Sequence, residues 1–182
     1  MRRLVVVPPV LAAEALDELK QWLAVTTTRD DAALVALLRA ALETCEGYTR
    51  AMPLVAGCEE VLPASYEWMP LATAPVVAIT NVEAMASDGT RAALPVDHYL
   101  IDITADGCGR LRLLRAVAET RLVVTFEAGI APGWASLPQG LRHGVLRLAA
   151  HNYREREAGE GKVHPPAAVA ALWQPWRRMR LA

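Results

Sequence analysis

The sequence has few features of an exported, membrane-bound or metal-dependent protein. Its three cysteines, Cys45, Cys58 and Cys108, are odd in number and widely spaced, which disfavours a disulfide framework and a Cys-x-x-Cys zinc motif. The apolar run Leu4–Val7 ends at two prolines, far short of a signal sequence or a membrane-spanning helix. We therefore expect a soluble, unexported chain with reduced thiols and no membrane association.

The chain also lacks a large net charge of either sign. Its 19 Lys and Arg residues nearly balance 20 Asp and Glu residues, so the formal net charge is −1 at pH 7. No global basic field is therefore available to recruit nucleic acid, and charge effects must be local. Aromatic residues make up only 5% of the sequence, yet five of them are Trp, so the positions of these rings are informative.

No motif typical of catalysis or metal binding is found. His151 and Glu155 are one helical turn apart, but a third ligand and the H-E-x-x-H pattern are missing. The glycine-rich segment 106–109 lacks the lysine of a phosphate loop, and Ser136 lies outside a G-x-S-x-G motif. We expect no enzymatic activity, no cofactor and no metal. A site assembled from distant residues would escape this test, so a small ligand-binding or enzymatic α+β domain stays an alternative.

Apolar residues at helical spacing predict two helices in the first third of the chain. The first is expected over Leu11–Ala24, with leucines on one face and charged residues on the other. A capping box from Thr28 to Asp31 should open the second, which is expected to end near Thr49 or Arg50.

The middle of the chain, residues 54–129, is rich in Val, Ile and Thr and predicts short antiparallel strands. We expect them at Leu54–Leu62, Val76–Met85, Arg91–Leu94, Tyr99–Ile103, Arg110–Leu113 and Arg121–Glu127. Asp-Gly pairs at 88–89 and 106–107 should form the tight turns of hairpins, where glycine adopts positive φ at low cost.

Helical spacing returns after Trp134. A third helix is expected from about Pro138 to Glu157, and a terminal helix over Ala167–Met179, interrupted at Pro175. The resulting fold class is α+β, with antiparallel helices, two N-terminal and two C-terminal, and an antiparallel β insert between the second and third helices. We divide it into an N-terminal helical pair (1–53), the β insert (54–133), and the C-terminal helices with a docking tail (134–182), folding as one compact unit.

The last residues of the sequence combine two tryptophans and three arginines, the residue types most enriched at protein interfaces. The predicted docking residues are Trp173, Trp176, Arg177, Arg178 and Arg180. Three positions apart on a helix, the two rings would project from nearly one face. Two alternatives stay open: the helix folds back and packs its rings on the core, or the basic tail serves a DNA-binding module.

The order of short segments along the chain resembles the head-to-tail connector (adaptor) proteins of long-tailed bacteriophages and of gene transfer agents. The matching segments are Leu16–Leu23, Asp30–Leu34, Glu46–Thr49, Leu71–Ile79, Ser87–Thr90, His98–Tyr99, Gly109–Leu111, Val124–Gly129, Leu137–Arg142, Ala150–Glu155 and Trp176–Leu181. The resemblance covers nearly the whole chain, and its specificity lies in the order and spacing of the segments. Where the family often ends in Pro-Tyr-Arg, this chain has Pro-Trp-Arg at 175–177.

The resemblance implies a structural, non-enzymatic protein. Such proteins form a dodecameric ring beneath the portal of the capsid and extend the channel through which DNA passes without specific binding. The five docking residues would then contact the portal protein, while the next connector or tail-completion protein binds the ring from the other side. The protein would be made in the bacterial cytoplasm and reside in the virion or phage-like particle at the head-to-tail junction.

Overall fold

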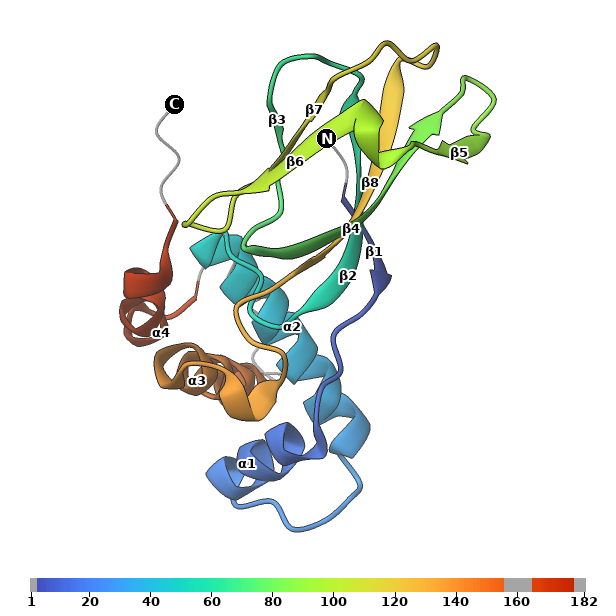
Figure 1. Ribbon diagram of the computed structural model, residues 1–182. Helices are drawn as coiled ribbons and strands as arrows, with labels where there is room; N and C mark the ends of the chain where they lie inside the picture. Colours follow the sequence, from blue (N-terminus) through green and yellow to red (C-terminus); the bar gives the residue numbers. More distant parts are fainter. Residues whose placement is uncertain (1–2, 156–164, 179–182) are drawn as a thin grey trace. The chain divides into compact units, whose positions relative to one another are not determined.

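The computed structural model describes residues 3–155 and 165–178, which fall into two compact units (Figure 1). A helical unit contains 10–54 and 130–182, and a β unit contains 1–9 and 55–129. Both helices and antiparallel sheets are present, so the α+β class is confirmed. The expectation of one compact unit is corrected, because each unit buries apolar residues of its own.

The helical unit contains four α-helices and two short 3-10 turns among its described residues. They are α1 (Ala13–Leu23), α2 (Asp31–Thr49), η2 (Trp134–Ser136), α3 (Gln139–Glu155), α4 (Ala167–Trp173) and η3 (Gln174–Trp176). The predicted capping box is wrong: α2 follows Asp30, which makes no side-chain cap. The terminal helix also ends earlier than expected, because the chain tightens into η3 at Pro175. No described helix is both long and apolar enough to cross a membrane.

Leucine and alanine side chains form the core of the helical unit, with α3 in contact with each of the other three α-helices. Two large rings, Trp134 and Trp173, are fully buried in it. Cys45 of α2 belongs to the same core, and its burial raises the pKa of the thiol to about 12. That thiol therefore packs as a small apolar group rather than as a nucleophile.

Among its described residues, the β unit contains eight strands in two antiparallel sheets. The strands are β1 (Arg3–Val7), β2 (Ala56–Pro63), β3 (Met69–Pro70), β4 (Val76–Met85), β5 (Arg91–Ala93), β6 (Tyr99–Ile103), β7 (Gly109–Leu113) and β8 (Arg121–Ala128), with a 3-10 turn, η1 (Val96–His98), before β6. One sheet has the order β1-β2-β8-β4-β5, and the other has the order β3-β7-β6. The two predicted glycine turns are confirmed, since Gly89 and Gly107 have φ of 91° and 77°.

Strand β8 lies at the centre of the larger sheet and is buried on both faces, with Leu122, Val123 and Val124 fully enclosed. Strand β2 alternates instead, so every second side chain points inward. One of these inward side chains is the carboxylate of Glu60, which is completely buried. It accepts hydrogen bonds from the backbone N–H groups of Ala72 and Thr73, both at 2.8 Å, and from the Thr73 hydroxyl at 2.6 Å.

Strand β1 was not predicted. Its Val-rich sequence pairs with β2 from Arg3–Glu60 to Val7–Gly57, which places the amino-terminal residues in the β unit and not in the expected helical pair. As an edge strand it leaves Leu4 and Val7 about half exposed or more, at 57% and 62%. The short strand β3 was also missed, because a two-residue strand that ends in Pro70 has no periodicity to detect.

Candidate docking site

Helix α4 lies on α3 and buries one of the predicted docking residues. The Trp173 side chain is fully enclosed, and its indole N–H donates a hydrogen bond to the carbonyl of Leu141 at 3.3 Å. The ring occupies the space that a side chain at Gly144 would need. The expectation that Trp173 contacts a partner is therefore corrected, because the alternative in which the ring packs on the core describes this residue.

After Trp173 the chain turns outward through η3, and the next side chains lie at the surface. Trp176 is 37% exposed, Arg177 is exposed and Arg178 is half-buried. Both rings approach α3, Trp173 at Gly144 and Trp176 at Gly140, but only Trp176 extends to the surface. The two rings separate into a core residue and a surface residue.

Two hydrogen bonds hold this turn on the end of α2. The Tyr48 hydroxyl donates to the side-chain oxygen of Gln174 at 2.7 Å, and the backbone N–H of Arg178 donates to the Thr49 carbonyl at 2.8 Å. The guanidinium of Arg177 lies 5.7 Å from the centre of the Tyr48 ring, within cation–π range. We call the set Tyr48, Trp176, Arg177 and Arg178 the tail surface.

Of the five predicted docking residues, three lie together at the surface, one is buried in the core, and one is outside the described residues. Trp176, Arg177 and Arg178 are grouped, Trp173 is buried, and Arg180 lies outside the described residues. The contact of Tyr48 with the tail was not predicted from the sequence. In the sequence, Tyr48 shows only a hydroxyl in the last turn of a helix. That feature does not identify a hydrogen-bond partner 126 positions away.

The tail surface offers rings and cations but no acid, base or nucleophile in a catalytic arrangement. His151 and Glu155, the residues considered for a metal, contact each other one turn apart on α3, with 3.0 Å between Nε2 and the carboxylate oxygen. In the part of the chain that the structure describes, no three His, Cys, Asp or Glu side chains converge.

Solved structures share this fold over the full length of the chain. One is the neck of an empty gene transfer agent (GTA) particle computed with C6 symmetry, 25% identical, with a TM-score of 0.78, over 100% of this chain and 98% of that chain. A second, the virion of a native GTA particle, is 27% identical with a TM-score of 0.74 and the same coverage. A third, the neck of a native GTA particle computed with C12 symmetry, is 26% identical with a TM-score of 0.75, over 98% and 97%.

These likenesses confirm the resemblance to head-to-tail connectors. No protein-family model matches the chain, and no curated protein matches it.

Proposed function

We propose that this chain, a head-to-tail connector by its likeness to GTA neck structures, is a structural adaptor that joins the capsid portal to the tail. It acts in the particle neck of a phage or gene transfer agent, where copies form a ring that extends the DNA channel. The observation that carries the proposal is the end-to-end match to neck proteins, which includes both units. Its role is structural rather than enzymatic.

A closed ring requires two different faces of each subunit to meet, since head-to-tail contacts must close on themselves. The C12 symmetry of one matching neck agrees with a ring of twelve copies. Helix α2 is the proposed wall of the ring, because its exposed positions include Ala32, Ala36 and Ala40, where a neighbour's backbone can approach closely.

The tail surface is the proposed contact with the portal protein. Trp176 supplies exposed apolar area, Arg177 and Arg178 supply cations, and Tyr48 holds them in place. Trp173 contributes indirectly, because its burial positions the turn that follows it. Arg180, which lies outside the described residues, extends the same basic segment in the sequence. The next connector or tail-completion protein would bind the opposite side of the ring.

The test replaces Trp176 and Arg177 together by alanine and measures binding of the full chain to purified portal rings by co-sedimentation. We expect a loss of affinity of about thirtyfold or more, since truncating an aromatic and an arginine at the centre of an interface typically costs about 2 kcal/mol or more. A matched control replaces Tyr66, which is 58% exposed, and the exposed Arg29 by alanine. Circular dichroism verifies that both variants stay folded.

Two outcomes would contradict different parts of the proposal. Wild-type affinity in the Trp176/Arg177 variant would show that the tail surface does not contact the portal. Failure of the wild-type chain to bind portal rings or to form rings with them would overturn the adaptor function itself.

A further inference from the structure

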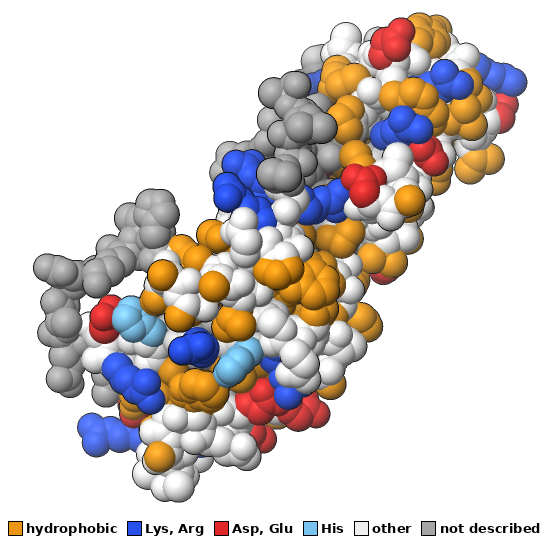
Figure 2. Space-filling view, turned by 90° about the vertical axis from the view of Figure 1, so that its left-hand side faces the viewer, with side chains coloured by type: hydrophobic (Ala, Val, Ile, Leu, Met, Phe, Trp, Pro, Cys, Tyr) orange, Lys and Arg blue, Asp and Glu red, His pale blue; other side chains and the backbone are white. Residues whose placement is uncertain are grey.

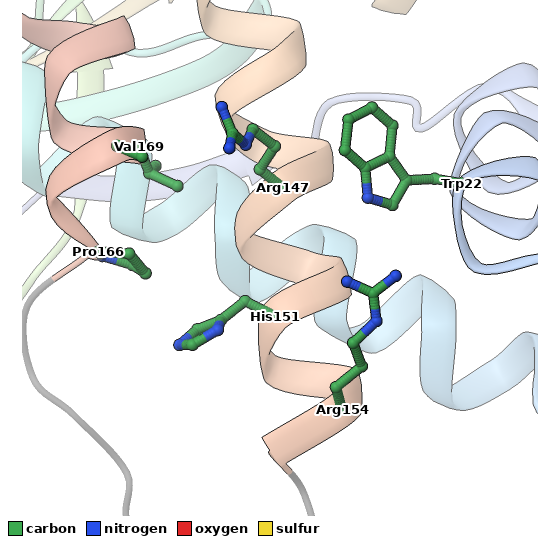
Figure 3. Close-up of a pocket in the computed structure, with 7 residues that line it drawn as sticks. Trp22, Arg147, His151, Arg154, Pro166 and Val169 are labelled. Atoms are coloured by element: carbon green, nitrogen blue, oxygen red, sulfur yellow. The ribbon is translucent and has the colours of Figure 1, made fainter.

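A groove crosses the helical unit between α1, α3 and α4 (Figure 3). Its volume is about 240 Å³, and it is lined by Trp22 of α1, Arg147, His151 and Arg154 of α3, and Pro166 and Val169 at α4. In the close-up, the Trp22 ring points from α1 toward α3, while Pro166 and Val169 face α3 from the other side. We call this the α3 groove; it contains none of the tail-surface residues.

The rim of the α3 groove is basic. His143, Arg147, His151 and Arg154 follow one another at intervals of four, four and three residues, which places them along one face of α3. Figure 2 shows basic and histidine side chains gathered around an apolar patch on this unit. Among the described residues, His151 is paired with Glu155, but neither Arg147 nor Arg154 forms an ion pair. The rim therefore holds two arginine charges that no described carboxylate neutralises.

The floor of the α3 groove is apolar. Val169 is buried, and Pro166 and Ala168 lie beside it at the start of α4. Trp22 is 43% exposed although tryptophan is costly to leave in water, and its ring stands edge-on to His143 with centroids 5.2 Å apart. A ring held in place at the mouth of a cavity of this size fits a single inserted aliphatic or aromatic side chain.

We propose that the α3 groove binds an acidic segment of a partner protein, with one apolar side chain inserted beside Trp22 and flanking carboxylates paired with Arg147 and Arg154. The carboxylates of such a segment complement the positive charge of the rim, and its apolar side chain complements the floor. A nucleic-acid backbone would satisfy the arginines but would leave the floor without a partner. The inference concerns a second contact of the subunit and holds whether or not the tail surface binds the portal.

The probes are two synthetic peptides with the same central leucine, one flanked by aspartates and the other by asparagines. Titration into the full-length protein is followed by isothermal calorimetry and by the Trp22 fluorescence difference between wild type and Trp22→Phe. We expect weak saturable binding of the aspartate peptide, with Kd on the order of 10⁻⁴ M, and at least about tenfold weaker binding of the asparagine peptide.

The variant Arg147→Gln with Arg154→Gln should weaken binding of the aspartate peptide about tenfold and abolish its dependence on salt. The matched control, Arg29→Gln with Arg39→Gln, removes the same charge from exposed positions outside the groove and should bind as wild type does. Equal binding of the two peptides, equal loss in both variants, or no binding of the aspartate peptide at millimolar concentration would overturn the proposal. Duplex DNA bound through Arg147 and Arg154, in place of the peptide, would also overturn it in favour of a nucleic-acid site.

Discussion

Glu60 shows how one buried charge organises a loop. Its carboxylate accepts three hydrogen bonds from residues 72 and 73, so it joins β2 to the segment that leads into β4. A carboxylate inside a protein is tolerated when donors surround it in this way. Glu59 and Glu60 are adjacent and identical, and adjacent strand residues face opposite sides of the sheet. The sequence alone therefore does not show which of the two carboxylates is buried.

Replacement of Glu60 by glutamine should lower the free energy of unfolding by about 2 kcal/mol, because the amide NH₂ group meets backbone N–H donors where an oxygen is needed. Chemical denaturation monitored by circular dichroism measures the change. Glu59→Gln is the control; Glu59 is only partly buried and pairs with Arg91 at 3.0 Å, so its loss should cost less than about 1 kcal/mol. Equal effects of the two substitutions would contradict the importance of the buried hydrogen bonds.

Gly144 allows α4 to lie close to α3. A Cβ at this position would overlap the indole of Trp173, so Gly144→Ala should displace the ring and destabilise the helical unit by about 2 kcal/mol. Thermal unfolding and the near-ultraviolet signal of the tryptophans report both effects. Gly47→Ala is the control, since nothing lies within 4 Å of its Cβ position in α2 and alanine there should stabilise the helix by up to about 1 kcal/mol. An unchanged melting temperature for Gly144→Ala would contradict the tight packing.

Helices and strands with a clear period were predictable from the sequence, and those that depend on distant contacts were not. Helix α2 and strands β4 and β6 lie where their apolar spacing placed them. The apolar run at residues 4–7 was judged too short for a signal sequence, and its strand was not predicted. The strand forms because it pairs with β2, some fifty residues later. The same pairing places β1 in the β unit, apart from the helices that follow it in the sequence.

The proposed docking residues were predicted to form one exposed group, but only some of them lie at the surface. The composition of the tail indicated a surface for a partner, and Trp176, Arg177 and Arg178 do lie together at the surface. The burial of Trp173 depends on a glycine 29 positions earlier, at 144, where the indole takes the place of a side chain. Local sequence carries no trace of such a contact, so composition alone could not assign the two tryptophans different roles.

The balance of charge over the entire chain predicts weak binding to DNA. With a formal net charge of −1, the protein lacks the positive field that drives non-specific binding to phosphates. We expect no measurable affinity for duplex DNA at about 0.15 M salt, as measured by fluorescence anisotropy, with a Lys- and Arg-rich DNA-binding protein as the positive control. Affinity that falls steeply with added salt would instead support a DNA-binding role for the basic tail.

The chain leaves and re-enters the helical unit at neighbouring points. Leu54 and Ala131 form a parallel bridge, and the backbone N–H groups of Ile130 and Ala131 donate to the carbonyls of Met52 and Pro53 at 2.9 and 3.2 Å. The insertion point is therefore closed by hydrogen bonds that belong to the helical unit itself. A change in the length of the segment between residues 54 and 130 can therefore leave the packing of the helices in place, because these hydrogen bonds fix where the chain leaves and returns.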